Sequence, residues 1–425
     1  MTRVFVSLLV SALLFASGGA AAGSKTNEQK SAKEEKRIGL DRHVAEKLLA
    51  ANELLAEDKH DAALAIVDEL AKRRKLGEAE LAQIHRFRGY IFVNQGKTEP
   101  AAAEFQKSLA QNALDRSAEQ AMTYSLAQLY TQLGRYDEAL ALIDAWFASE
   151  ESPKADAYYL KAMILVQQEK FSEAVLPART AIEKSAQPRE SWLQLLVAIY
   201  GNLKDYPNVA ATLAQLANLN PGKKLYWVQL AAVQNYLERD AKALATMQLA
   251  HQAELLDDDK ELRQLARLLY LQQLPFQCAQ VIEEAMAEGT VKPDADAYGL
   301  LSNCYLAARE GDEALAPLAK AAELSPDGEM YVLLGQLRLQ REEFDAALAA
   351  LHQALPKAKP ERQGSIQLLI GVAQLGSERF DAAERAFRAA QGDEKVRRAA
   401  ESYLRFVQEQ RARQQQQALR TASIQ

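Results

Sequence analysis

From Asp41 onward, hydrophobic residues recur at the spacing of an α-helix, in segments of roughly 14 residues. The segments come in pairs, and short polar turns separate them. No segment alternates hydrophobic and polar residues in the manner of a strand. The pattern therefore predicts an all-α fold that is built from helix pairs.

One small residue in the second helix of each pair marks a repeat. It recurs every 33 to 38 positions, at Ala63, Ala101, Ala139, Ala174, Val209, Ala243, Cys278, Ala314, Ala347 and Ala383. A period of this length is typical of a solenoid, in which each unit is too small to bury its own hydrophobic face. Neighbouring units must stack and share one core, so the expected product is a long curved surface.

The most regular copies show what each position of the repeat contributes. Gly335 on the first helix and Ala347 on the second let two antiparallel helices approach closely, while larger residues fill the gap to the next unit. An aromatic residue, Phe344, precedes the second helix, and we expect it to cover the end of the pair. Pro177 and Pro317 lie deep in second helices and predict kinks there.

These residues resemble the tetratricopeptide repeat, or TPR. The segment with Trp227, Leu230, Ala231, Ala243, Met247 and Ala250 fits its consensus, and so does the segment with Tyr298, Leu301, Tyr305, Ala314, Leu318, Ala321 and Pro326. The resemblance covers about 350 residues. It implies a right-handed α-solenoid of about ten TPR-like helix pairs over residues 41–392.

The two ends of the chain differ from the repeats. A positive residue, a short hydrophobic run and small residues before position 23 predict a signal peptide at 1–22, cleaved after Ala22; an uncleaved anchor or a buried helix is the alternative. Residues 23–40 predict a disordered charged linker. A capping helix with its inner face at Ala399, Ala400, Tyr403, Leu404 and Val407 is expected at 393–413, followed by a disordered tail at 414–425. The mature chain is not expected to span a membrane.

Composition narrows the classes of partner. Hydrophobic residues make up 48 % of the chain and charged residues 25 %, and the net charge is -6, which argues against a nucleic-acid surface. An exported protein would hold Cys278 and Cys304 in an oxidising compartment. We expect two separately buried thiols, with a disulfide between neighbouring units as the alternative.

The side chains of the sequence do not indicate catalysis. The five histidines are scattered with no pair at helical spacing, and no phosphate-binding glycine loop or hydrolase motif occurs. Asp257, Asp258 and Asp259 stand immediately before a helix, so capping of that helix is favoured over calcium binding. The expectation is a non-enzymatic protein without cofactor, metal or small-molecule substrate.

The concave face of the solenoid is the candidate functional surface. The first-helix positions that line it collect tyrosines and amides with little charge: Arg86, Tyr90, Asn94, Tyr124, Gln128, Gln132, Tyr159, Met163, Gln167, Gln194, Asn202, Asn235 and Tyr236. Amides can pair with the backbone of an extended peptide, and tyrosine rings offer flat surface at low entropic cost. Packing between repeats is the competing interpretation for each single tyrosine. Arg263, Arg267 and Tyr270 form a candidate pocket for a carboxylate.

Two tryptophan-centred segments, residues 190–196 and 226–233, together with the Leu176-Pro177 kink, resemble the periplasmic TPR proteins associated with TonB-type energy-transduction systems. This resemblance implies a periplasmic scaffold that contacts TonB or the associated inner-membrane motor proteins during energised outer-membrane transport. TonB carries a Pro-rich extended segment, and an aromatic and amide-lined groove suits polyproline II ligands. The alternative is a TPR adaptor in envelope assembly, serving outer-membrane protein insertion, polysaccharide export or cell-wall synthesis.

Overall fold

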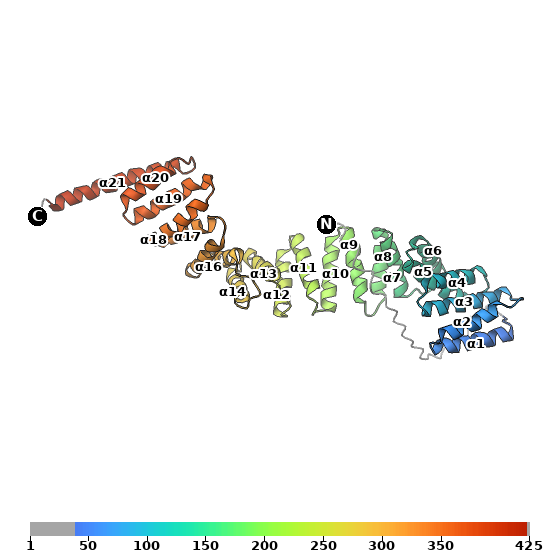
Figure 1. Ribbon diagram of the computed structural model, residues 1–425. Coiled ribbons are helices and arrows are strands. Elements are labelled where there is room, and N and C mark those ends of the chain that lie inside the picture. The colour runs from blue at the N-terminus through green and yellow to red at the C-terminus, as the bar shows by residue number, and fades with distance from the viewer. Residues whose placement is uncertain (1–38, 423–425) are drawn as a thin grey trace. The chain divides into compact units, whose positions relative to one another are not determined.

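The computed structural model describes residues 39–422, and within them every regular element is helical (Figure 1). The all-α prediction is confirmed. The chain divides into two compact units, unit 1 up to Leu219 and unit 2 from Asn220 onward. The predicted signal peptide and nearly all of the predicted 23–40 linker lie outside the described residues.

Unit 1 contains five helix pairs, in which we call the first helix A and the second helix B. The bounds of the pairs are α1 (Arg42–Ala56) with α2 (His60–Ala71), α3 (Glu78–Asn94) with α4 (Thr98–Ala110), α5 (Arg116–Gln132) with α6 (Tyr136–Ser149), α7 (Ala155–Gln167) with α8 (Phe171–Glu183), and α9 (Glu190–Asn202) with α10 (Tyr206–Leu219). Each helix A packs against its own helix B, and helices α2, α4, α6 and α8 also pack against the next helix A. Unit 1 is therefore a stack of repeats.

Unit 2 continues with five more pairs and one final helix. The bounds are α11 (Lys224–Tyr236) with α12 (Asp240–Gln252), α13 (Asp259–Leu271) with α14 (Pro275–Ala287), α15 (Ala295–Ala307) with α16 (Gly311–Leu324), α17 (Glu329–Gln340) with α18 (Phe344–Ala354), α19 (Pro360–Gly376) with α20 (Phe380–Ala390), and α21 (Arg397–Ala422). A short 3₁₀ turn, η1 (Leu355–Lys357), follows α18. The described helices thus form the expected ten pairs, numbered here as repeats 1 to 10.

The same turn joins helix A to helix B in all ten described repeats. In the turn that follows each helix A, one residue has a positive φ. These residues are Asp58, Gly96, Gly134, Glu169, Lys204, Glu238, Gln273, Arg309, Glu342 and Glu378. The next backbone N–H then donates to the carbonyl five residues earlier, as from Lys59 to Leu54 and from Arg379 to Gln374, both at 2.9 Å. This is the Schellman arrangement, which satisfies carbonyls that a helix end would leave without partners.

The small residue that marks the period is a core residue in every repeat. Val209 is 5 % exposed, and the other nine marker residues are 0 % exposed. The glycines of helix A have the expected role as well, because a Cβ at Gly335 would lie 2.6 Å from Leu351 Cγ of the paired helix. Large residues of helix B therefore occupy the space that small residues of helix A leave open.

The aromatic residue at the start of helix B reaches beyond its own pair. The Phe344 ring lies against Gly376 at the end of the next helix A, where a Cβ would clash with it. Similarly, the Tyr136 hydroxyl lies 3.4 Å from Gln167 Oε1 at the end of α7. The aromatic residue thus joins one repeat to the next.

Helices α8 and α16 continue through Pro177 and Pro317, which are both buried. Pro100, Pro207 and Pro275 lie in the first turns of α4, α10 and α14, where a missing N–H leaves no hydrogen bond unmade. The effect of the two internal prolines on the curvature of the repeats stays a prediction.

Helix α21 closes the end of unit 2, as the sequence predicts for a capping helix. Ala400 and Val407 are 0 % exposed, and the Tyr403 ring stacks on Phe387 of α20 with centroids 5.0 Å apart. The predicted bounds are wrong at both ends, because the helix begins at Arg397 and continues to Ala422. Residues 414–422 are helical, and their glutamine, alanine and arginine residues favour the helix.

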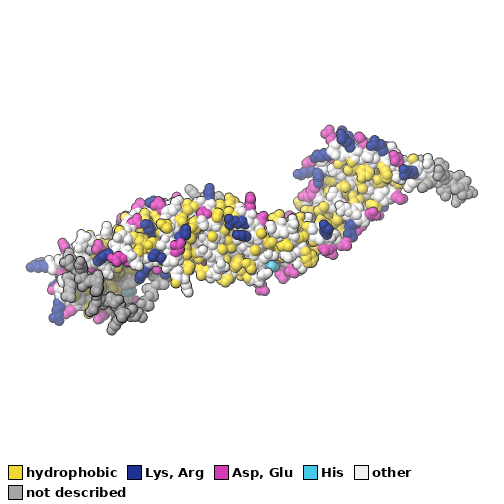
Figure 2. All heavy atoms as spheres, turned by 180° about the vertical axis from the view of Figure 1, so that it is seen from behind, with side chains coloured by type: hydrophobic (Ala, Val, Ile, Leu, Met, Phe, Trp, Pro, Cys, Tyr) yellow, Lys and Arg dark blue, Asp and Glu magenta, His cyan; other side chains and the backbone are white. Residues whose placement is uncertain are grey.

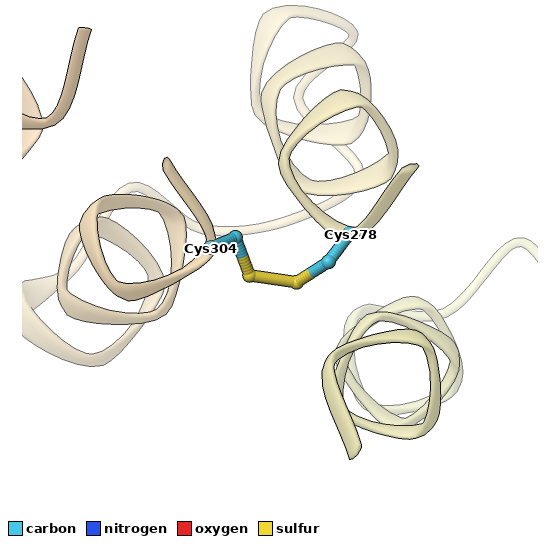
Figure 3. Close-up of a disulfide and its surroundings, with 2 residues drawn as sticks. All are labelled: Cys278 and Cys304. Carbon is cyan, nitrogen blue, oxygen red and sulfur yellow. A yellow bond between two sulfur atoms is a disulfide. The ribbon is translucent and has the colours of Figure 1, made fainter. Parts of the chain in front are cut away.

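Cys278 and Cys304 form a disulfide (Figure 3), so the expectation of two separate thiols is wrong. Cys278 lies on α14 and Cys304 on α15, and the two Cα atoms are 5.9 Å apart. That separation falls in the range that a disulfide requires. The physical reason is that the marker position of helix B faces the next helix A, where the second cysteine stands.

Candidate functional site

The predicted groove residues of unit 1 lie on helices A, and their tyrosines pack against other aromatic rings. Tyr124 contacts Trp146 of α6 with ring centroids 5.2 Å apart, and Tyr159 stacks on Trp192 of α9 at 5.3 Å. Tyr90 meets Phe105 edge to face at 5.0 Å. All three tyrosines are half-buried. Each ring therefore packs within the repeat stack and also has part of its surface exposed.

The hydroxyl groups of Tyr124 and Tyr159 stay neutral. Burial raises the pKa of Tyr124 to about 12, and the nearby carboxylate of Asp156 raises it further. Burial also raises the pKa of Tyr159. A neutral phenol can donate a hydrogen bond and accept one. Together with Gln128, which follows Tyr124 by one helical turn and is half-buried, they give this face polar groups without charge.

Other predicted residues of unit 1 have side chains that interact with residues of their own helix. Asn202 donates from Nδ2 to the Ala198 carbonyl at 2.8 Å, and Gln194 donates to Glu190 at 3.3 Å. The Arg86 guanidinium lies 5.8 Å from the centroid of the Phe87 ring. The strongest candidates for ligand contact in unit 1 are therefore Tyr124, Gln128 and Tyr159.

In unit 2, Arg263 does not form part of a carboxylate pocket, and this prediction is wrong. It is 8 % exposed, and its guanidinium donates to Asp259 at 2.9 Å, to both oxygens of Asp294 at 3.0 Å and to the Lys292 carbonyl at 2.9 Å. These bonds fasten α13 to the loop before α15. Arg267 and Tyr270 are exposed on α13, and Asn235 and Tyr236 are exposed on α11.

One of the three aspartates at the start of α13 caps the helix, as the sequence predicts. Asp258 caps α13, accepting a hydrogen bond from the Lys260 backbone N–H at 2.8 Å. Asp257 forms an ion pair with Lys224. Between residues 39 and 422, no group of three or more His, Cys, Asp or Glu side chains is arranged to hold a metal ion.

A second groove in unit 2 was not among the predicted site residues. It has a volume of about 470 Å³ and lies across three consecutive A helices, α15, α17 and α19. Its lining includes Leu306, Leu333, Gln336, Leu337, Gln340 and Leu369. Figure 2 shows hydrophobic side chains gathered on one face of unit 2 toward its C-terminal end, with charged side chains around them. The sequence could have indicated this groove, because Leu306, Gln336 and Gln340 occupy first-helix positions that supplied predicted groove residues in other repeats.

Stacked helix pairs define this chain as a solenoid repeat protein. Residues 94–176, in unit 1, match the family model described as anaphase-promoting complex, cyclosome, subunit 3. Residues 332–400, in unit 2, match the model described as tetratricopeptide repeat. The chain thus contains tetratricopeptide repeats, and such repeats bind protein partners.

Solved TPR structures resemble the chain at low sequence identity. A TPR protein from Parabacteroides merdae is 13 % identical, with 69 % of this chain and 99 % of that chain covered and a TM-score of 0.34. The C-terminal part of a TPR protein from Cytophaga hutchinsonii is 14 % identical, with 66 % and 95 % covered and a TM-score of 0.39. The TPR2AB domain of yeast Sti1, in a complex with pHSP90, is 15 % identical, with 61 % and 99 % covered and a TM-score of 0.34.

Among curated proteins, none matches the chain significantly. Over the part of the chain that the structure describes, no helix combines the length and the hydrophobicity that crossing a membrane requires.

Proposed function

We propose that this protein is a non-enzymatic periplasmic scaffold that binds extended peptide segments of envelope proteins. Its partner in this proposal is TonB or an associated inner-membrane motor protein, and its role is to support energised outer-membrane transport. The observation that carries the proposal is the face of α5 and α7 on which Tyr124, Gln128 and Tyr159 present neutral hydroxyls, an amide and aromatic surface.

This face suits an extended chain for two reasons. Ring contacts with Trp146 and Trp192 hold the tyrosine rings in place, so a ligand that packs on them loses little additional side-chain entropy. A polyproline II segment has carbonyls without internal partners, and the tyrosine hydroxyls and the Gln128 amide can donate to them. A Pro-rich segment of the kind that TonB carries fits both requirements.

Two further features support the periplasmic part of the proposal. The first 22 residues have the pattern of a signal peptide. The disulfide between Cys278 and Cys304 is of a kind that persists in oxidising compartments. The resemblance of the two tryptophan-centred segments to TonB-associated TPR proteins supports the choice of partner.

A photo-crosslinking amino acid at position 159, in living cells grown under iron limitation, tests the proposal. We expect a covalent adduct with TonB or a motor protein, identified by mass spectrometry. The matched control is the same crosslinker at Leu176, which is 74 % exposed on helix B of the same repeat. Adducts at position 159 with unrelated proteins only would contradict the partner, and adducts with an assembly factor would indicate the envelope-assembly adaptor.

Two substitutions separate the ring of Tyr159 from its hydroxyl. Tyr159→Phe keeps the stacking on Trp192 and removes the donor, whereas Tyr159→Ala removes both. We expect capture of TonB from periplasmic extract to fall about fivefold for Tyr159→Phe and further for Tyr159→Ala. Equal capture by all three proteins would show that this face does not bind the partner.

A further inference from the structure

Residues 72–75, with the sequence Lys-Arg-Arg-Lys, form a basic loop between repeat 1 and repeat 2. All four residues are exposed. Among the loops that join one described repeat to the next, this is the only one with four adjacent cations. The packing of the repeats does not require these charges, because none of the four residues is buried.

The basic loop is fixed at two points. Arg73 Nη1 donates to Asp41 Oδ1, immediately before α1, at 3.2 Å. Leu76, which follows the loop, packs against the hydrophobic core of repeats 1 and 2. The other three cations of the loop form no ion pair with any of the described residues. The fold therefore holds three uncompensated positive charges close together.

The carboxylates that lie nearest the basic loop in the sequence are mostly engaged elsewhere. Asp68 and Glu69, at the end of α2, form ion pairs with cations of other helices at 3.1 Å and 3.9 Å. Glu80 is buried and accepts a hydrogen bond from the Gly77 backbone N–H at 2.9 Å. Glu78, in the first turn of α3, is exposed. One carboxylate against three cations leaves the loop with a surplus of positive charge.

The charges of repeat 1 are separated along its helices. Glu57, Asp58 and Asp61 lie at the turn between α1 and α2, whereas the basic loop follows the other end of α2. Helix α1 has 15 residues, so the two ends of the pair are about 22 Å apart. At about 0.1 M salt the Debye length is about 10 Å, so the acidic end has little effect at the basic loop. The net charge of the whole chain therefore does not determine what the loop attracts.

The exposure of these cations indicates which anionic partner they suit. An exposed ion pair with a single carboxylate contributes little, because water and salt screen it and the side chains lose entropy. A nucleic acid needs a longer basic surface, since its affinity comes from many phosphate contacts. A membrane with anionic phospholipids acts on all the cations of a loop together, and each Lys or Arg near such a surface strengthens binding about fivefold.

From these observations we infer that the basic loop of repeat 1 docks on the surface of a membrane that contains anionic phospholipids. Lys72, Arg74 and Lys75 attract the headgroups, and the bond from Arg73 to Asp41 holds the loop against α1. The contact is electrostatic and confined to the membrane surface. The inference does not depend on the partner proposed for the tyrosine face of α5 and α7.

Co-sedimentation with lipid vesicles tests the inference. The chain used begins at Gly23, which removes the hydrophobic run at residues 4–16 and keeps every described helix. We expect binding at about 0.1 M salt to vesicles of phosphatidylglycerol and phosphatidylethanolamine in equal parts, and loss of binding at about 1 M salt, where the Debye length falls to about 3 Å. Vesicles of phosphatidylcholine alone should not bind the chain. Equal binding to both kinds of vesicle would overturn the inference.

A triple variant assigns the contact to the basic loop. Lys72→Gln, Arg74→Gln and Lys75→Gln together should weaken binding to the anionic vesicles about hundredfold, at about fivefold for each cation. The matched control removes three exposed cations of other repeats: Lys170→Gln, Lys204→Gln and Lys242→Gln. Both variants change only exposed side chains, so their unfolding midpoints should stay unaltered. Equal binding by the two variants, which have the same net charge, would contradict the role of the loop.

Two anionic polymers separate the membrane from other partners. A labelled poly-glutamate peptide represents an acidic protein segment, and a labelled DNA duplex represents nucleic acid. Both should bind at least tenfold more weakly than anionic vesicles at the same concentration of negative charge. Tighter binding of either polymer, lost in the triple variant, would overturn the membrane contact in favour of that partner. Tyr159→Ala should leave vesicle binding unchanged, so failure of the membrane contact and failure of the tyrosine face give different results.

Discussion

Gly335 sets how closely α17 and α18 can pack, since the buried Leu351 fills the space beside it. Gly371 has the same role against Phe387 one repeat later, and Gly89 against Phe105 in unit 1. The sequence pattern was sufficient to predict the small and large packing positions of repeats 9 and 10. These residues determine how closely the two helices of one repeat approach, and the repeat pattern itself specifies that distance.

Gly335→Ala should lower the free energy of unfolding by about 1–3 kcal/mol, because the new Cβ would lie 2.6 Å from Leu351 Cγ and force the core to shift. The control is Gly299→Ala, where the nearest atom, Met330 Cε, lies at an ordinary 3.5 Å. That variant should gain up to about 1 kcal/mol from helix propensity. Urea unfolding monitored by circular dichroism measures both, and equal shifts would contradict the packing role.

Glu104 is a buried carboxylate of unit 1, at 5 % exposure. Its Oε2 accepts a hydrogen bond from His85 Nδ1 at 2.6 Å, and its Oε1 accepts one from Lys107 at 2.8 Å. Burial raises the pKa of Glu104, but these bonds and the charge of Arg88 outweigh burial and bring it to about 2. The folded state therefore binds this proton less tightly than the unfolded state.

The stabilisation from Glu104 should be complete above pH 4.5 and decline as the pH falls toward 2. Glu104→Gln should cost about 2 kcal/mol at neutral pH, since hydrogen bonds to charged groups contribute about 1.5–3 kcal/mol. We expect the difference between the two proteins to shrink in urea unfolding below pH 4.5. A difference that is constant down to pH 2.5 would contradict the assignment.

Contacts outside the repeated positions could not be predicted from the sequence. The marker residues were predictable because one period fixes them all. The partner of Tyr124 was not, because Trp146 stands at a position of α6 where other repeats have a small residue, such as Ala250 or Ala321. Likewise, Asp294 follows Arg263 by 31 positions, and only the fold brings the two together.

At the scale of elements, α21 completes unit 2 in the manner of an additional helix A. Besides its buried Ala400 and Val407, it places Arg411 beside Glu384 at 3.0 Å and in an ion pair with Asp381. Arg379 of repeat 10 pairs with Asp345 of repeat 9 in a similar way. The existence and inner face of this helix were predictable from its pattern, but its length was not, because propensity rather than packing extends it.

A chain that ends at Val396 lacks α21 and should lose about 3 kcal/mol or more of stability in unit 2, since side chains such as Phe387 become exposed. A chain that ends at Arg413 keeps every buried residue named above and should unfold like the full chain. Thermal unfolding with light scattering measures stability and aggregation together. Similar midpoints for the two truncated chains would show that α21 is not a cap.

At the scale of the molecule, the division into two units determines how far a local change spreads. The disulfide closes a segment of 26 residues inside unit 2 and joins repeats 7 and 8. Both sulfur-bearing residues are 0 % exposed. In repeat arrays, stability is carried by nearest-neighbour contacts, so the effect of this bond should be confined to nearby helices.

Reduction should destabilise the region of α14 and α15 by about 3 kcal/mol, from the entropy that the closed loop removes from the unfolded chain. Hydrogen exchange should accelerate in these helices and stay unchanged in α1 to α5. In the variant with both Cys278→Ala and Cys304→Ala, reductant should have no effect. Accelerated exchange across unit 1 upon reduction would contradict the confinement.

The ten turns between helix A and helix B also indicate how the stability of this protein can be raised. Eight of the described turns place a residue other than glycine in the left-handed conformation, and only Gly96 and Gly134 suit it. Each of the eight accepts backbone strain of about 1 kcal/mol that glycine would avoid. Positions such as Glu169 and Glu342 are exposed and distant in sequence, so their effects should add. The turns therefore offer an engineer a graded series of thermostable variants in which no groove residue is altered.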